Sequence, residues 1–276
     1  MMKEQPIGLS AAEERKMESR NDYTAVNSKT WDVWAEHGCE WSVPITHEDF
    51  VQAKAGNWGV FLTPCKTVPK DWFLPFPGMK ILGLASGGGQ QMPIFAALGA
   101  DVTVFDNSDC QLSAERMVAS RENYGIRVVK GDMTRPLPFS DGSFDLIFHP
   151  VSNCYVQEVL PIWRECFRVL RPGGVLLAGF SNPLVFLFED SDPLRVVNSL
   201  PYDPLRNASD EEYRRMADNW EGIQFSHSLE TQIGGQLLAG FRLTHLFEDY
   251  DRPGDCALRE YTPTYLATRA VKPEFS

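Results

Sequence analysis

The chain has 276 residues, of which 43% are hydrophobic and 23% charged, and its formal net charge is -11. This length suits one large α/β domain with an insertion and a substantial core. The acidic balance, with no basic stripe, argues against a nucleic-acid partner, because phosphate backbones are bound by clustered Lys and Arg. No apolar run is long enough to span a bilayer and no signal-peptide core opens the chain. We therefore expect a cytoplasmic protein with reduced cysteines and no membrane partner.

The N-terminal part divides into an arm and an aromatic segment. Residues 1–22 are polar and charged, which predicts a flexible arm. Residues 23–78 predict a cap segment, in which frequent prolines allow only a short helix over residues 29–37. The tryptophans before Trp72 fit ordinary core better than a lid or a substrate wall, and the two roles are compatible.

From residue 79 the hydrophobic pattern alternates strands with helices, which is typical of a parallel doubly wound sheet. The predicted strands are 80–84, 102–105, 126–130, 144–148, 175–179, 241–247 and 265–271. The predicted helices are 91–98, 110–122, 155–170, 210–220 and 229–239. The pattern lapses over residues 181–222, which we interpret as an insertion containing the short acidic helix. The predicted fold is an α/β Rossmann-like sheet of seven strands, mostly parallel with an antiparallel terminal strand, over residues 79–276.

The turn after the first strand predicts a nucleoside site. It is formed by Ser86, Gly87, Gly88, Gly89 and Gln90. Consecutive glycines let a ligand approach the main chain, whose N–H groups can hold a carboxylate or phosphate. A dinucleotide fingerprint needs a third glycine for close helix–strand packing, and Met92 stands at that place, which weakens the pyrophosphate interpretation.

Acidic residues end the next two strands. Asp106, followed by Asn107, can accept both hydroxyls of a ribose, although a helix N-cap is the alternative for a lone acid there. After the third strand come Gly131, Asp132 and Met133. Asp132 can accept a bond from the exocyclic amine of adenine while Met133 packs on the ring, the alternative being ordinary turn chemistry.

Two longer motifs make the family resemblance specific: GDMTRPLPFSDGSFDLIF over residues 131–148 and RVLRPGGVLLAGF over residues 168–180. With the glycine turn and Asp106, they resemble the core of class I S-adenosylmethionine-dependent methyltransferases of the small-molecule, methyltransferase-11-like type. The resemblance implies S-adenosylmethionine as cofactor, with its methionine part at the glycine turn, its ribose at Asp106 and its adenine at Asp132. One departure is that Gly83 and Ala85 stand where the family carries an acid and a glycine.

Two histidines are candidates for a catalytic base. His149 and Asn153 leave the fourth strand at the sheet edge where ligands bind, so His149 fits a general base or a cofactor contact and Asn153 a hydrogen bond to ligand. The alternative is that His149 packs a loop. His227 shares a helical turn with Glu230 and fits a pocket wall, or simply the start of a helix. No cluster has metal-ligand spacing, so no metal is predicted.

The function we predict is methyl transfer from S-adenosylmethionine to an oxygen, nitrogen or carbon of a small-molecule acceptor. Two alternatives stay open on the sequence alone. One is a non-catalytic domain that binds S-adenosylmethionine as a sensor or scaffold, and the other is an NAD(P)-dependent oxidoreductase.

Overall fold

The central sheet has seven strands in the order β3-β2-β1-β4-β5-β9-β8, in a computed structural model that describes residues 20–274. Its strands are β1 (Lys80–Leu84), β2 (Asp101–Asp106), β3 (Ile126–Lys130), β4 (Phe144–His149), β5 (Leu170–Ser181), β8 (Arg242–Asp249) and β9 (Tyr265–Val271). The first five pair in parallel, whereas β9 lies antiparallel between β5 and β8. The predicted Rossmann-like sheet with an antiparallel terminal strand is therefore confirmed.

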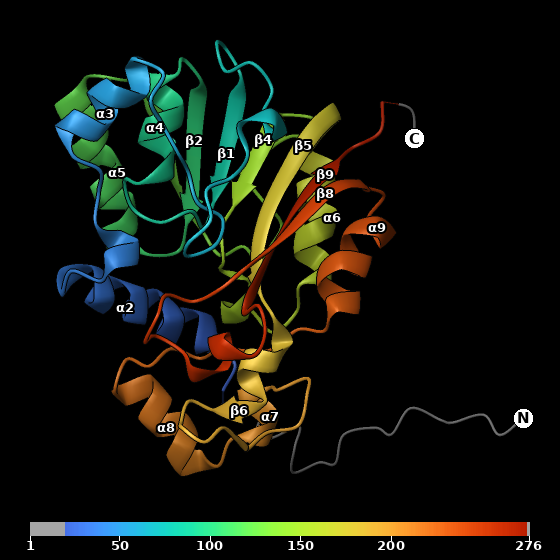
Figure 1. Cartoon of the computed structure of the whole chain (residues 1–276). Coiled ribbons are helices and arrows are strands. Elements are labelled where there is room, and N and C mark those ends of the chain that lie inside the picture. Colours follow the sequence, from blue (N-terminus) through green and yellow to red (C-terminus); the bar gives the residue numbers. More distant parts are fainter. Residues whose placement is uncertain (1–19, 275–276) are drawn as a thin grey trace, which may run out of the picture.

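Helices cover both faces of the sheet (Figure 1). One face carries α3 (His47–Lys54), α4 (Gln91–Ala97) and α5 (Asp109–Glu122), and the other carries α6 (Leu160–Val169) and α9 (Gly235–Leu238). Alternate residues of β1 explain the two cores, because successive strand side chains point to opposite faces. Ile81 joins the cluster that contains Phe95 of α4, while Leu82 joins the cluster that contains Trp163 of α6.

Several predicted boundaries differ from the structure. Helix α6 starts at residue 160 instead of 155, because residues 153–155 form the separate turn η3 (Asn153–Tyr155). The helix predicted over 229–239 opens as the π-helical turn η5 (Glu230–Gly234) before α9. A Cβ on Gly235 would lie 2.8 Å from Cδ1 of Trp163, so this glycine permits the close approach of α9 to α6.

Helix α2 of the cap segment packs with the insertion at one end of the sheet, whereas α3, also in the cap, lies beside α4 on a face of the sheet (Figure 1). The cap contains α2 (Tyr23–Glu36), which is longer than the predicted helix, together with η1 (Glu40–Ser42) and η2 (Lys70–Trp72). The insertion contains η4 (Pro183–Phe186), β6 (Phe188–Glu189), β7 (Arg195–Val196), α7 (Pro204–Asn207) and α8 (Asp210–Asp218). Of these, only α8 corresponds to a predicted element. It begins with a capping box between Ser209 and Glu212, which explains why its start was detectable.

A small hydrophobic core, separate from the two cores of the sheet, joins α2 to the insertion. In this core Tyr23 packs against Phe225, with 5.1 Å between the ring centroids. Asn27 of α2 donates to the carbonyl of Ile223 and accepts from its N–H, at 2.9 and 2.7 Å. Most of the predicted arm over 1–22 lies outside the described residues. At its end, however, Arg20 is buried and donates to the carbonyls of Pro204, Leu205 and Ala208.

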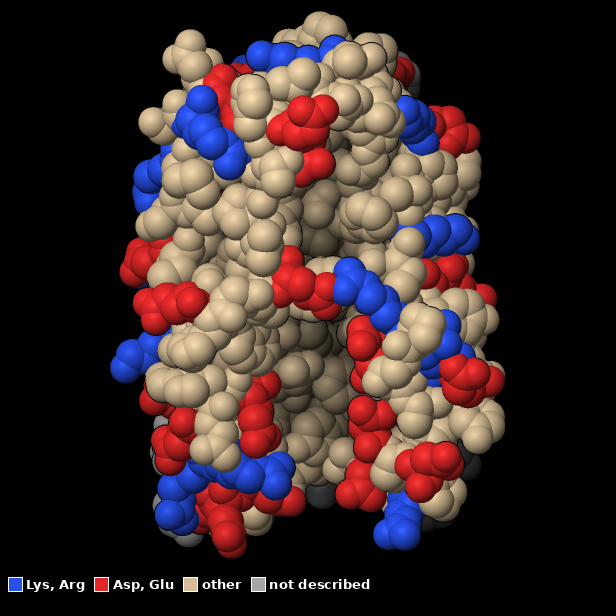
Figure 2. Space-filling model, turned by 60° about the vertical axis from the view of Figure 1, so that its left-hand side comes forward, with Lys and Arg blue, Asp and Glu red and all other residues tan. Residues whose placement is uncertain are grey.

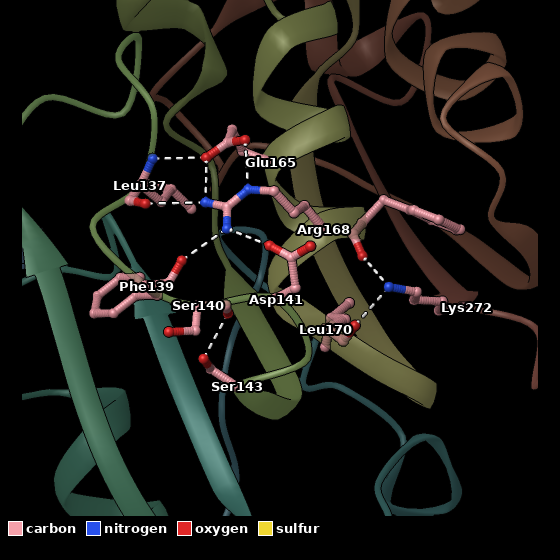
Figure 3. Close-up of polar contacts among 10 residues, drawn as sticks. Leu137, Phe139, Ser140, Asp141, Ser143, Glu165, Arg168, Leu170 and Lys272 are labelled. Atoms are coloured by element: carbon pink, nitrogen blue, oxygen red, sulfur yellow. Dashed lines mark hydrogen bonds and ion pairs between the residues drawn. The ribbon is translucent and has the colours of Figure 1, made fainter.

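The two longest family motifs meet in a hydrogen-bonded network around Arg168 (Figure 3). Its guanidinium donates to both carboxylate oxygens of Glu165, at 2.8 and 2.7 Å, and to the carbonyls of Leu137 and Phe139, at 2.9 and 2.7 Å. A further bond reaches Asp141 at 2.9 Å. These bonds tie the loop after β3 to α6, so much of the motif signal serves the fold and not the ligand site.

Candidate functional site

A cavity of about 390 Å³ lies at the carboxyl ends of β1 to β4, beneath α2. This is the edge at which open α/β sheets bind ligands. Its walls come from the four segments that leave these strands: Ala85, Ser86, Gly87, Phe105, Asp106, Asn107, Gly131, Asp132, Met133, Pro150, Val151 and Ser152. Figure 2 shows hollows with uncharged floors and acidic side chains along their rims.

The glycine turn holds one buried polar group without a partner among the described residues. Ser86 is 2% exposed, and its hydroxyl has no hydrogen-bond partner among the described residues. Ala85 and Gly87 adopt left-handed backbone, at φ 48° and 83°, which turns the chain sharply out of β1. A buried hydroxyl without a partner is costly. The Oγ of Ser86 lies against Gly83, so the sharp turn buries this group behind the cavity wall.

The structure shows what surrounds Gly83, the glycine that stands where the family carries an acid. A Cβ there would lie 2.4 Å from Oγ of Ser86 and 2.7 Å from Sδ of Met92. At the position that carries an acid in the family, two neighbouring side chains therefore occupy the space, and a larger residue would require Ser86 and Met92 to move.

Behind the turn, α5 packs closely on the glycines and carries a buried acid. Neither Gly88 nor Gly89 lines the cavity: a Cβ on Gly88 would lie 2.3 Å from Oε1 of Gln111, and one on Gly89 2.9 Å from Val118. Glu115 is fully buried, and burial raises the pKa of its carboxyl to about 8, despite the lowering effect of the Gly89 N–H.

Asp106 lies at the tip of β2 on the cavity wall. One carboxylate oxygen accepts from the N–H of Ser108 at 2.9 Å. Burial raises the pKa of Asp106 to about 6, against the lowering effect of the Ser108 and Asn107 N–H groups. The N-cap of α5 is Ser108, whose Oγ accepts from Gln111, so capping is not the role of Asp106.

The segment after β3 lines the same cavity one strand further along. Asp132 accepts from the N–H of Thr134 at 2.8 Å, so the predicted turn chemistry is present, yet Asp132 and Met133 also face the cavity. A Cβ on Gly131 would lie 2.4 Å from Cζ of Phe105, which explains why glycine precedes the acid.

His149 and Asn153 do not line the cavity, contrary to our expectation. His149 is fully buried, with Nδ1 2.8 Å from the carbonyl of Leu84 and Nε2 2.8 Å from the amide of Asn153. Its ring packs edge-on against Trp163, on the α6 side of the sheet. Burial lowers the pKa of His149, and Asn153 in turn bonds Gln232. These residues brace the loop after β4 and are not part of the proposed site.

His227 has a similar bracing role. It is 8% exposed, and its Nε2 lies 3.0 and 2.9 Å from the carbonyls of Asn153 and Val156. It does not line the cavity, and burial lowers its pKa. The helix-start interpretation of this segment fits better, since Ser228 accepts from the N–H of Thr231. No histidine among the described cavity residues is available as a general base.

Sequence reasoning missed the residues that roof the cavity. They come from α2 and η1, from η3, and from the ends of the β8–β9 connection: Thr24, Asn27, Ser28, Trp31, Glu40, Trp41, Tyr155, Asp251, Asp255 and Tyr265. The tryptophans are divided between the two expected roles, because Trp31 and Trp41 line the cavity while Trp72 is 3% exposed in the core. The abundance of tryptophan in the cap was the one sequence feature that pointed to this roof.

Helix α2 bonds directly to the loop that carries Asp106. Ser28 donates to the carbonyl of Asn107 at 2.6 Å, and the Asn107 amide donates to the carbonyl of Thr24 at 3.0 Å. Asp32 accepts from the Ser108 hydroxyl and the Cys110 N–H, at 2.6 and 2.9 Å. The roof and the acid-bearing loop are therefore one hydrogen-bonded unit.

The sheet order, the inserted antiparallel β9, the glycine turn and two acids at adjacent strand tips together define a class I methyltransferase fold. Residues 82–178 match the family model described as a methyltransferase domain. The chain is 48% identical over 256 residues to the "uncharacterized methyltransferase YbaJ" of Bacillus subtilis, covering 91% of this chain and 99% of that protein. The chain therefore belongs to the class I S-adenosylmethionine-dependent methyltransferases.

Other similarities are more distant. A demethylmenaquinone methyltransferase of Paenarthrobacter aurescens is 34% identical over 125 residues, covering 45% of this chain and 47% of that protein. The fold matches the crystal structure of an S-adenosylmethionine-dependent methyltransferase from Mesorhizobium loti with a TM-score of 0.60 at 20% identity, covering 73% of this chain and 94% of that one.

The cavity suits the cofactor of this family. S-adenosylmethionine carries a cationic sulfonium and a cationic ammonium, and the described wall residues contain five carboxylates and no Lys, Arg or His. These acids are Glu40, Asp106, Asp132, Asp251 and Asp255. Carboxylates at the tips of β2 and β3, Asp106 and Asp132, supply hydrogen-bond acceptors on the same wall. Charge and hydrogen-bonding capacity therefore both fit the group.

Proposed function

We propose that the chain methylates a small-molecule acceptor inside this cavity. The observation that carries the proposal is the placement of Asp106, Asp132 and the Ser86 turn on one wall, at the ends of three adjacent strands. In this proposal Asp106 binds the ribose hydroxyls, Asp132 the adenine amine, and the cavity-lining part of the turn (Ser86, Gly87 and Gln90) the methionine end. The strand order then sets the direction in which the cofactor lies, from β3 across β2 to β1.

When bound, S-adenosylmethionine supplies a methyl group on a positively charged sulfur. The chain aligns the acceptor with that group and excludes water from the cavity. Aromatic walls suit the exclusion of water, since Trp31 packs edge-on against Tyr155 at 5.4 Å and both line the cavity. We propose that α2 and η1, in the cap over 23–78, form part of this roof, and that the insertion over 181–222 supports it by packing on α2.

The acceptor side of the proposed site lies toward β4, β5 and β9. Val151, Ser181 and Tyr265 line the cavity there. Burial and the nearby carboxylate of Asp251 raise the pKa of Tyr265, so its hydroxyl stays protonated and bonds Asp251, which leaves the phenol oxygen to accept a hydrogen bond from the acceptor. In this proposal Asp251, which lines the cavity beside Tyr265, receives the proton of an acceptor that must lose one.

A small acceptor is supported by the enclosure of the cavity and by the distant relatives, which include a demethylmenaquinone methyltransferase and a sterol 24-C-methyltransferase. Among the described residues, no helix is long and apolar enough to span a bilayer. The enclosure and the relatives favour an acceptor that enters the cavity whole over one that presents only a protruding side chain.

Calorimetric titration with S-adenosylmethionine, S-adenosylhomocysteine and NADH tests the cofactor assignment. We expect binding of the two sulfur nucleosides and none of NADH. Incubation with the labelled methyl donor and a panel of phenols, quinols, amines and lipids then tests the reaction. Binding of the nucleosides with no transfer to any class, together with transfer to a protein or nucleic acid, would contradict a small acceptor.

A further inference from the structure

The turn η1 lies directly over the glycine turn. The Gln90 amide donates to the carbonyls of Glu40 and Val43, at 2.8 and 3.1 Å. The Trp41 carbonyl lies 3.2 Å from the point where a Cβ on Gly87 would stand. Glu40 and Trp41 both line the cavity, so η1 is the wall opposite the proposed methionine end.

The carboxylate of Glu40 is held by an arginine from the other end of the chain. Arg252, in the β8–β9 connection, forms an ion pair with Glu40, and its guanidinium lies 5.1 Å from the ring centroid of Trp41. The side chains of Arg252 and Glu40 are 45% and 46% exposed, and Arg252 does not line the cavity. An exposed pair of this kind contributes little to stability, so another cation can replace the arginine at low cost.

The amino-acid end of the cofactor brings such a cation. Its carboxylate suits the N–H groups of the glycine turn, whereas its ammonium needs an anionic acceptor close to that turn. Position 83 is a glycine and supplies no acid, and Asp106 and Asp132 stand at β2 and β3, on the nucleoside side. Glu40 is the cavity carboxylate whose own residue is hydrogen-bonded to the glycine turn.

We propose that Glu40 binds the ammonium group of the cofactor's amino-acid end, and that Arg252 is the counter-ion of Glu40 when that group is absent. The inference rests on the proposed function, because it takes the nucleoside to lie along β3, β2 and β1. The acid of this subsite thus comes from the cap segment instead of the first strand. Cofactor binding also releases Arg252, and with it one tether of the β8–β9 connection.

Two ligands separate this role from a general effect on the cavity. S-adenosylhomocysteine has the ammonium group without the sulfonium charge, and 5'-methylthioadenosine has the same nucleoside without the amino acid. In Glu40→Gln we expect calorimetry to show about tenfold weaker binding of S-adenosylhomocysteine, as for loss of a charge-assisted bond. Binding of 5'-methylthioadenosine should stay within about twofold, which also shows that the variant is folded.

Glu260→Gln is the matched control, because Glu260 pairs with Arg259 at 2.7 Å in the same connection and does not line the cavity. It should change neither affinity. Arg252→Gln removes the competing cation, so it should bind S-adenosylhomocysteine about threefold more tightly and 5'-methylthioadenosine unchanged.

The role of Glu40 is refuted if Glu40→Gln affects both ligands equally or neither. Competition by Arg252 is refuted if Arg252→Gln leaves S-adenosylhomocysteine binding unchanged or weakens it. If the unaltered protein binds neither nucleoside, the proposed function itself fails, which is a distinct result from loss of discrimination at position 40.

Discussion

Replacing Asp106 by Asn tests the proposed ribose contact most directly. Asn keeps the size of the side chain and removes its charge, so the loss is that of charge-assisted hydrogen bonds to two hydroxyls. Such bonds contribute about 1.5–3 kcal/mol, which corresponds to roughly tenfold to hundredfold weaker binding of S-adenosylhomocysteine. Asp101→Asn is a matched control, because Asp101 is exposed at the opposite end of the same strand.

The raised pKa of Asp106 adds a pH dependence with a definite sign. In the free protein the carboxyl has a pKa of about 6, and the ribose binds its ionised form. As pH falls below 6, affinity should therefore drop by about tenfold per pH unit, while Asp106→Asn should show no such drop. Titrations at pH 8 and pH 5 measure this. Equal affinities of the unaltered protein at both values, or an unchanged affinity in the variant, would refute the ribose role.

Three further replacements test the supporting structure by urea denaturation. His149→Gln should lower the free energy of unfolding by about 1–3 kcal/mol with little change in nucleoside affinity. Because burial lowers the pKa of His149, the unaltered protein should also lose stability as pH falls below 6.5, and the variant should lose less. Because burial raises the pKa of Glu115, the free energy of unfolding of the unaltered protein should fall as pH rises from 4.5 to about 8, by about 1.4 kcal/mol per unit of pKa shift. Glu115→Gln should abolish this fall. Parallel curves of stability against pH for the two proteins would contradict this. Arg168→Lys should lower the free energy of unfolding by about 2–4 kcal/mol, because lysine cannot form the two parallel bonds to Glu165. The control Arg215→Lys, at an exposed ion pair, should change it by no more than about 0.5 kcal/mol. Similar losses in both variants would show that the network contributes no more than an exposed pair.

The sheet was predictable because its strands are short apolar runs separated by turns, and because parallel strands bring their carboxyl ends to one edge. That rule alone places the glycine turn, Asp106 and Asp132 together. The antiparallel closing by β9 was also predictable, since the last two runs are neighbours in the chain and are joined by a modest loop that contains Pro253 and Gly254.

The roof was not predictable, because it depends on tertiary packing between segments far apart in the chain. Trp31 and Glu40 from the cap meet Asp251 and Tyr265 near the C-terminus, and no local pattern connects them. The assignment of His149 failed for a different reason. A residue at a strand end can point toward the ligand edge or toward a covering helix, and here the imidazole packs on Trp163 of α6.

The bonds between α2 and the loop after β2 have a consequence for turnover. Each catalytic cycle must replace the spent nucleoside with a fresh one, yet in the proposed site the adenosine end lies beneath a helix whose Ser28 and Asp32 are bonded to that loop. Exchange on the side of the cavity that α2 covers thus requires separation of α2 from the loop. The rate at which these few hydrogen bonds open sets a ceiling on how fast this route can operate, whatever the speed of the chemical step.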